Sequence, residues 1–219
     1  MKPAAQSFLR FPLSLVFGSP ANVRVLRALA RHGGILSASA LANTATLTKP
    51  SVLSALQQLI AVGIVEVVGD DRQRLYRFRE DGEFGPALGA LFAAESQNYR
   101  DVIESIRTSA EKCGAEAAWV YGSVAKGEDG PRSDFDIVVV STRGRAYDVA
   151  TAMRDNVSYS GRVPHSSISV VGLDAQEITR LEREGDPWWL DLKRDAMVIL
   201  GPAPDAYVGR SPAKLRRAR

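Results

Sequence analysis

Two short aliphatic segments joined by a polar, glycine-containing loop constrain the fold of this chain more than any other feature. The first, "AAWVY" at residues 117–121, runs directly into Gly122 and Ser123, and the second, "FDIVVV", follows Asp134 and contains Asp136. Short runs rich in valine and isoleucine are typical of buried strands. The chain therefore has to place a glycine turn and two carboxylates at the edge of a sheet.

The two aspartates are predicted to open the second strand and to form one acidic site. Because side chains alternate along a strand, Asp134 and Asp136 project to one face and Phe135 to the other. Two carboxylates about 6 to 7 Å apart repel by roughly 2 to 3 kcal/mol at an effective dielectric constant near 20. A bound cation relieves this repulsion, and oxygen ligands suit Mg²⁺ or Mn²⁺. The alternative is an acidic strand end that faces solvent or caps a helix.

The loop between the two strands offers groups that can bind phosphate. Gly122 permits a tight turn, and Ser123 can present its hydroxyl and N–H groups to an anion. The loop and the acidic pair together predict a metal bound beside a phosphate.

The pattern G-S-x10-D-x-D between two strands resembles the signature of the minimal nucleotidyltransferases of the DNA polymerase beta superfamily, and the likeness covers residues 99–202. The resemblance implies that Gly122 and Ser123 hold the phosphates of a nucleoside triphosphate. Lys126, Arg132 and Ser133 are weaker nucleotide-binding candidates, because the cations of the loop either pair with the triphosphate or remain solvated. It also implies that Asp134 and Asp136 are the catalytic, metal-binding residues. The implied reaction transfers a nucleoside monophosphate from the triphosphate to a protein or RNA hydroxyl, and pyrophosphate leaves. Small members of that family often pair with a small helical, toxin-like protein in a toxin–antitoxin setting.

One expected residue of that family is missing. Active members usually carry a third carboxylate on a later strand beside the D-x-D strand, and the candidate strand here, "SSISVVGL", contains no acid. Ser169 lies about where the acid is expected, and we do not expect Asp174, just after the strand, to reach inward. Serine is a weak metal ligand and not a general base at neutral pH. Two hypotheses stay open: a nucleotide-transferring enzyme, or a regulator whose degenerate domain binds nucleotide or a partner without catalysis.

Hydrophobic spacing in the first third of the chain predicts helices followed by a hairpin. One helix stops at Gly33, as helices commonly do at glycine. A later helix begins after Thr48, a capping residue, with Pro50 in its first turn, where the missing N–H costs nothing. "IVEVVGDDRQRLYRF" then predicts two strands with a turn at residues 69–71.

Three helices followed by a two-stranded wing resemble the winged helix-turn-helix of MarR-type and ArsR-type transcription regulators. The resemblance implies a homodimer whose second motif helix enters the major groove of DNA while the wing contacts phosphates. Winged helices also serve as dimerisation or protein-docking modules, which is the alternative. The implied DNA-binding residues on the helix and the wing are Lys49, Ser51, Ser54, Gln57, Gln58, Arg72 and Arg74.

The composition of the 219-residue chain sets wider limits. Hydrophobic residues make up 45% of it, which is enough for two cores. No apolar run approaches the roughly 18 residues that cross a membrane, so no membrane partner is expected. The single cysteine, Cys113, cannot form an internal disulfide, so we expect a cytoplasmic protein.

We therefore expect an α/β (α+β) fold in two domains, with a small mixed sheet flanked by helices in the second. The spacing of apolar residues in the linker allows one long helix or two shorter ones. The expected order is a winged helix-turn-helix DNA-binding domain at 12–80, a linker helix region at 81–98, a nucleotidyltransferase-like domain at 99–202 and a basic flexible tail at 203–219.

Overall fold

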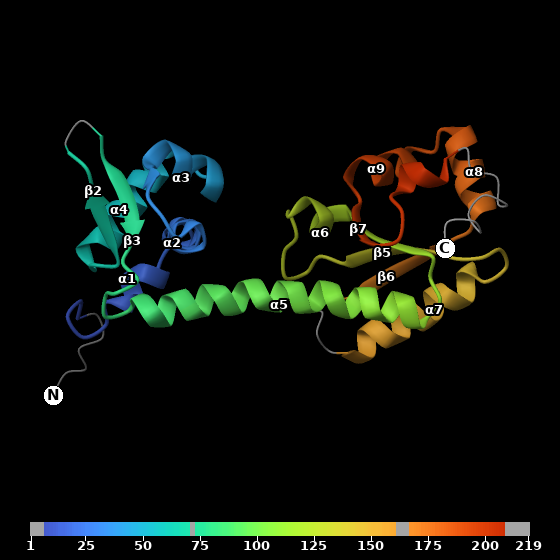
Figure 1. Cartoon of the computed structure of the whole chain (residues 1–219), viewed down its shortest axis with the longest axis horizontal. Coiled ribbons are helices and arrows are strands. Elements are labelled where there is room, and N and C mark those ends of the chain that lie inside the picture. Colours follow the sequence, from blue (N-terminus) through green and yellow to red (C-terminus); the bar gives the residue numbers. More distant parts are fainter. Residues whose placement is uncertain (1–6, 71–72, 161–166, 209–219) are drawn as a thin grey trace. The chain divides into compact units, whose positions relative to one another are not determined.

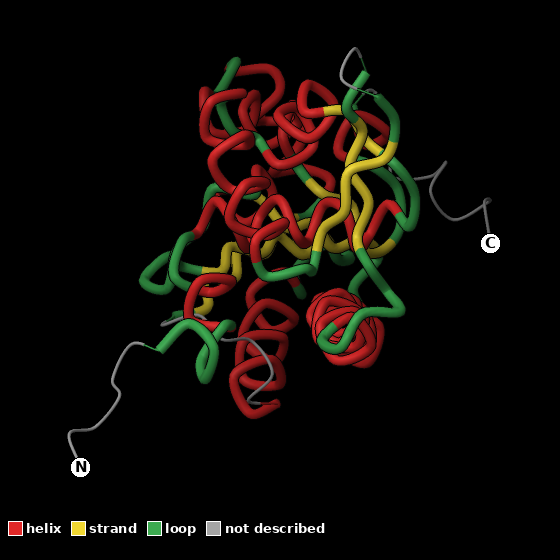
Figure 2. Tube along the Cα trace, turned by 90° about the vertical axis from the view of Figure 1, so that its left-hand side faces the viewer, coloured by secondary structure: helices red, strands yellow, loops and turns green. Residues whose placement is uncertain are grey.

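The computed structural model describes residues 7–70, 73–160 and 167–208. The chain divides into two compact units, Met1–Asn98 and Tyr99–Arg219. Each unit combines helices with its own sheet (Figure 1), and the helices and strands are distinguished by colour in Figure 2. This is the predicted α+β class with two domains. Within the described residues, no helix is both long and apolar enough to cross a membrane.

The amino-terminal unit is a helical bundle with a small antiparallel sheet. The sheet has the order β1-β3-β2, so the hairpin of β2 and β3 is extended by a short strand that precedes the helix-turn-helix. Its elements are α1 (Leu13–Phe17), α2 (Pro20–His32), β1 (Leu36–Ser37), α3 (Ala38–Ala45), α4 (Lys49–Ala61), β2 (Val65–Val68) and β3 (Leu75–Phe78).

The helix ends in this unit follow the predicted signals. The hydroxyl of Thr48 accepts a hydrogen bond from the backbone N–H of Ser51, and Pro50 lies in the first turn of α4. Gly33 ends α2 with φ 65°, a left-handed conformation that glycine adopts without strain. Both predicted boundaries are confirmed, because each depends on groups within a few residues of one another.

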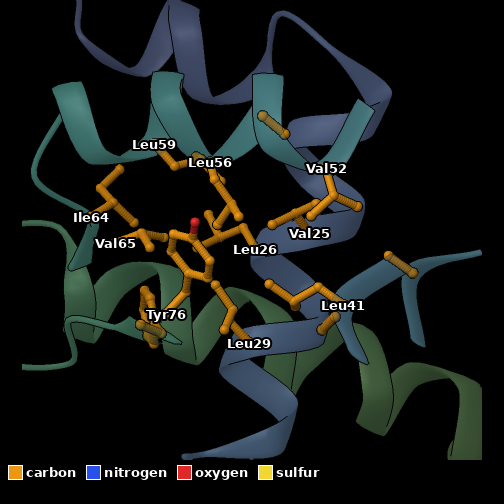
Figure 3. Close-up of a cluster of buried hydrophobic side chains, with 14 of the residues drawn as sticks. Val25, Leu26, Leu29, Leu41, Val52, Leu56, Leu59, Ile64, Val65 and Tyr76 are labelled. Carbon is orange, nitrogen blue, oxygen red and sulfur yellow. The ribbon is translucent and has the colours of Figure 1, made fainter. Parts of the chain in front are cut away.

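The core of the amino-terminal unit joins the helices to the wing. Leucines of α2 and α4 surround the ring of Tyr76 from β3, and Ile64 and Val65 close the other side (Figure 3). Leu26, Leu29 and Leu59 are fully buried. Burying a leucine side chain contributes roughly 1.5 to 3 kcal/mol, so these contacts hold α4 in place on the hairpin.

A single long helix, α5 (Gly85–Lys112), follows the wing. Its first turns supply Leu88 and Phe92 to the amino-terminal core. Its last turns supply Val102 and Ile106 to the core of the other unit. The spacing in the linker therefore belongs to one helix and not to two.

The carboxyl-terminal unit is built on a mixed sheet of order β6-β5-β4-β7. β4 is antiparallel to both β5 and β7, whereas β5 and β6 are parallel. Its elements are β4 (Ala117–Tyr121), α6 (Gly122–Lys126), β5 (Phe135–Val140), α7 (Ala146–Ser160), β6 (Ile168–Leu173), α8 (Ala175–Glu184), α9 (Pro187–Asp195), β7 (Met197–Leu200) and the 3₁₀ turn η1 (Pro204–Tyr207).

Both faces of this sheet are covered. Phe135 and Ile137 of β5 pack with residues of α5 and α7 on one face. Val138 and Val140 pack with residues of α8 and α9 on the other face (Figure 1). Because side chains alternate along the strand, Asp136 belongs to the face covered by α8 and α9.

The predicted flexible tail begins too early at residue 203. Tyr207 is 3% exposed, and its ring packs edge-on against Trp119 with centroids 5.7 Å apart. An aromatic ring in this position anchors the segment to the core. Residues 209–219, which hold the basic cluster of the predicted tail, lie outside the described residues.

Candidate functional site

Gly122 and Asp136 lie against each other at the point where β4 turns into α6. Tyr121, the last residue of β4, pairs with Asp136 in the antiparallel register. Gly122 has φ 73°, and a Cβ on it would lie 2.7 Å from Oδ2 of Asp136. Glycine is required here for two reasons, the left-handed backbone and the close approach of the carboxylate.

The negative charge of Asp134 acts on Asp136, and Asp134 precedes the strand instead of opening it. β5 begins at Phe135, and Asp134 is exposed. The pKa of Asp136 is raised above its ordinary value, first by partial burial and then by the negative charge of Asp134. A cation between the two carboxylates would favour their ionised forms.

A serine of strand β6 and a serine just before this strand present hydroxyl groups to the two aspartates. Ser169 pairs with Asp136 in the parallel register, and its hydrogen bond acts to lower the pKa of that carboxyl. The hydroxyl of Ser167 donates a hydrogen bond to Oδ1 of Asp134. Ser169 therefore lies opposite Asp136, on the strand where the third carboxylate was expected. Ser167 was missed, although its spacing of two from Ser169 matches the spacing of the aspartates.

Asp174 is used elsewhere. Its carboxylate accepts hydrogen bonds from the backbone N–H groups of Gln176 and Glu177, at 2.8 and 3.0 Å. Glu177 in turn accepts from the N–H of Asp174 at 2.8 Å, which completes a capping box at the start of α8. As expected, Asp174 does not serve as the missing ligand.

The donor set fits one hard cation. Within the part of the chain that the structure describes, no group of three or more histidine, cysteine, aspartate or glutamate side chains is arranged to hold a metal. Asp134 and Asp136 supply two carboxylates, and Mg²⁺ is often bound by one or two carboxylates together with waters and phosphate oxygens. A second metal ion lacks protein ligands here.

The other predicted loop residues are distributed around α6. Nζ of Lys126 lies 3.2 Å from Oδ2 of Asp195 on α9. The hydroxyl of Ser133 accepts a hydrogen bond from the N–H of Gly130 at 2.9 Å and so closes a turn. Ser123 is partly exposed and Arg132 is exposed. The structure thus brings Gly122, Asp134 and Asp136 together and places Lys126 at the far end of α6.

The two tryptophans of α9 differ in their relation to this site. The ring of Trp188 packs edge-on against Tyr121, with centroids 5.6 Å apart and an interplanar angle of 87°. Burial, followed by the charge of Asp136, raises the pKa of Tyr121. Trp189 is fully buried, and its indole N–H donates to Glu182 at 2.6 Å. Trp189 is therefore a core residue, whereas Trp188 belongs to the border of the site.

The predicted DNA-binding residues of α4 fall into two groups. Lys49, Ser54 and Gln57 are exposed on one side of the helix. Ser51 is half-buried, and its hydroxyl lies 2.9 Å from Oγ1 of the capping Thr48.

Gln58 faces the interior of the unit. Its Oε1 accepts a hydrogen bond at 2.8 Å from the side-chain amide of Asn22, which is 1% exposed. The same amide donates to the carbonyl of Leu15 at 2.7 Å. A buried amide requires such partners, so Gln58 stabilises the contact between α2 and α4.

The wing arginines also differ from one another. Arg74 is exposed, whereas Arg72 lies outside the described residues. Nη2 of Arg77 lies 2.5 Å from Oε1 of Glu66 on the facing strand, and Nη1 of Arg79 donates to the carbonyl of Gly63 at 3.3 Å. Arg77 and Arg79 therefore stabilise the hairpin and its connection to α4.

Comparison with protein-family models gives one match within each unit. Residues 19–74 match the family model described as MarR family, and residues 104–184 match the model described as Polymerase beta, Nucleotidyltransferase. Both predicted resemblances are confirmed. A comparison with curated proteins gave no match.

Two solved structures are similar to part of the chain. One is the MarR family transcriptional regulator SPO1453 from Silicibacter pomeroyi DSS-3, with 21% identity and a TM-score of 0.33 over 42% of this chain and 65% of that one. The other is NadR in complex with 4-hydroxyphenylacetate, with 21% identity and a TM-score of 0.34 over 48% of this chain and 83% of that one. The first match spans just under two thirds of the regulator's length.

Proposed function

We propose, for a chain that joins a MarR-family domain to a polymerase-beta nucleotidyltransferase domain, that it is a DNA-binding regulator whose second domain binds a nucleoside triphosphate with Mg²⁺. The observation that carries the nucleotide proposal is the packing of Gly122 against Asp136. A side chain at residue 122 would push into the carboxylate, so the turn and the acidic pair are built as one unit.

Each part of the site has a role in this proposal. Asp134 and Asp136 would hold one divalent cation, which supplies positive charge to the phosphates. Gly122 leaves room for the carboxylate of Asp136 beside the turn. Ser123 would offer its hydroxyl and N–H to phosphate. Lys126 adds a positive charge at the end of α6.

Ser169 of β6, and Ser167 just before this strand, favour binding over rapid transfer. Ser167 and Ser169 donate hydrogen bonds to the aspartates but cannot take a proton from an acceptor hydroxyl at neutral pH. A site with two carboxylates supports one metal ion. We therefore infer that nucleotide occupancy, and not turnover, is the principal output of this domain.

Nucleotide transfer to a protein or RNA hydroxyl is the second candidate, and the intact arrangement of Gly122, Asp134 and Asp136 favours it. The test is incubation with each labelled nucleoside triphosphate, Mg²⁺ or Mn²⁺ and candidate acceptors. Wild type is compared with the Asp134→Ala, Asp136→Ala double variant and with Asp155→Ala, an exposed control on α7. If wild type and Asp155→Ala bind nucleotide without transferring it and the double variant does not bind, the regulator is supported. If wild type and Asp155→Ala transfer the label and the double variant does not, the enzyme is supported. Absence of binding in wild type rejects both.

The exposed side of α4 and the wing support the DNA proposal. Lys49, Ser54 and Gln57 can reach base edges and phosphates in the major groove, and Arg74 can reach the backbone. Affinity for the DNA upstream of the protein's own gene should fall as salt rises. Sedimentation of the free protein tests the homodimer that the MarR resemblance implies, and co-expression with neighbouring genes tests the small helical partner.

A further inference from the structure

Lys126, the positively charged residue of α6, already has an anionic partner within the protein. Nζ of Lys126 lies 3.2 Å from Oδ2 of Asp195, and the Asp195 side chain is 20% exposed. The guanidinium of Arg194 donates to the same carboxylate through Nε and Nη2, both at 2.8 Å. Arg194 first, and then Lys126, holds the pKa of Asp195 down at about 2. Asp195 is therefore ionised at neutral pH, and it would compete with a phosphate group for Lys126.

Helix α9 contacts both ends of the segment that forms the predicted phosphate turn. Near its start, Trp188 packs against Tyr121, the residue before Gly122. At its end, Asp195 pairs with Lys126. Side chains three residues apart in a helical turn share a face, so Lys126 lies on the side of α6 that carries Ser123. The lysine thus lies one helical turn beyond Ser123, where it is held by a carboxylate of α9.

We propose that Asp195 is an internal substitute for a phosphate group, which occupies Lys126 until a triphosphate displaces it and thereby lowers the affinity of the site. This inference rests on the proposed nucleotide binding. Asp195 stays paired when Lys126 leaves, because the two N–H groups of Arg194 remain on its carboxylate. Replacing Asp195 by phosphate as the partner of Lys126 therefore leaves no carboxylate without a partner. Asp195 is a positioning residue, because it acts on the nucleotide only through Lys126.

The test measures binding of Mg²⁺–tripolyphosphate, which contains no base, and of Mg²⁺–ATP by titration calorimetry. Asp195→Asn should bind both probes roughly three- to fivefold more tightly, since it frees one partly exposed ion-pair partner. Asp191→Asn is the matched control, because Asp191 also pairs with Arg194, at 2.9 Å. It should change the affinity by less than about twofold. Asp195→Ser is a second charge-removing variant in case Asp195→Asn folds poorly.

A double-mutant cycle separates the proposed contact from a general charge effect. If Asp195 acts through Lys126, the gain from Asp195→Asn disappears in the Lys126→Met background. A gain that persists there would mean a long-range field and would overturn the inference. Unchanged or weaker binding by both charge-removing variants, with binding intact in wild type, would also overturn it. Absence of binding in wild type would instead reject the proposed function, and this inference with it.

Discussion

The two units position their candidate functional residues in different ways. In the amino-terminal unit, Lys49, Ser54 and Gln57 lie on one side of a single helix, and the spacing along that helix decides which side chains are exposed. In the carboxyl-terminal unit, Gly122 directly follows β4, and the pairing of β4 with β5 and of β5 with β6 brings it close to Asp136 and Ser169. A local pattern builds the first surface, and sheet register builds the second. Single substitutions should therefore leave the stability of the fold unchanged on the first surface and lower it at the centre of the second.

The largest effect is expected at Gly122. Gly122→Ala places a Cβ 2.7 Å from Oδ2 of Asp136 at a residue with φ 73°. We expect a loss of about 2 to 3 kcal/mol in the free energy of unfolding, because strain at positive φ adds to the clash. The affinity for Mg²⁺–ATP should fall at least about tenfold, because the carboxylate of Asp136 has to leave its position in a preorganised site. Denaturant unfolding and calorimetry measure the two quantities.

Gly127→Ala is the matched control for this variant. Gly127 also has a positive φ, 68°, but a Cβ there would meet nothing within 4 Å. It should cost roughly 1 kcal/mol of stability from backbone strain alone and leave nucleotide affinity unchanged. Equal loss of affinity in the two variants would show that the contact with Asp136 is unimportant.

The second effect concerns the buried amide that joins α1, α2 and α4. Asn22→Ala leaves the carbonyl of Leu15 and Oε1 of Gln58 without their donor. Removing one partner of a buried hydrogen bond costs about 1 to 3 kcal/mol, and we expect about 2 kcal/mol here. Thermal and denaturant unfolding of the full chain measure this cost.

Gln57 and Gln58 form a matched pair within the same helix. Gln58→Ala should lower stability because Asn22 loses its acceptor, whereas Gln57→Ala, at an exposed position, should lower DNA affinity with an unchanged Tm. The opposite pattern would reverse the assignment of the two faces of α4. If neither variant changes DNA affinity, the helix does not read bases.

The same contrast explains what could be predicted from the sequence. The cap at Thr48 and the aspartate pair depend on neighbours a few residues away, so their pattern is visible in the chain. Ser169 was identified from the family resemblance, which expects a carboxylate on that strand, and the structure pairs it with Asp136. Asp195 and the inward orientation of Gln58 were not predicted, because each depends on a partner far away in the sequence. Helical spacing places Gln58 near the edge of the exposed face of α4, but it does not show that the buried amide of Asn22 needs it as an acceptor.

The third effect tests how strongly the helix surface uses charge. Lys49→Ala should weaken binding to the upstream DNA about three- to tenfold at physiological salt and reduce the slope of log affinity against log salt by about 1. Arg77→Gln, in the wing, is the control, since Arg77 is already paired with Glu66 at 2.5 Å. Its slope should stay near that of wild type. Equal slopes for all three proteins would place the phosphate contacts elsewhere.

The smallest effect is a pH dependence at the sheet site. Because the folded state raises the pKa of Asp136, its proton is held more tightly in the folded than in the unfolded chain. Stability therefore falls as pH rises from the ordinary aspartate pKa, about 4, through the raised value in the folded protein. Asn cannot ionise, so Asp136→Asn should have a Tm about 1 to 3 °C above wild type at pH 7 and equal to it below pH of about 3.5.

Mg²⁺ should reverse the order of these two proteins. An ion that binds only the folded state raises Tm by mass action, and it needs the carboxylate that Asp136→Asn lacks. We expect millimolar Mg²⁺ to raise the Tm of wild type at pH 7 and to leave that of Asp136→Asn unchanged. Asp155→Asn, on α7, should follow wild type in both conditions. If Mg²⁺ raises the Tm of wild type and Asp136→Asn equally, the ion binds elsewhere, and the sheet site would then depend on its serine hydroxyls and not on a metal.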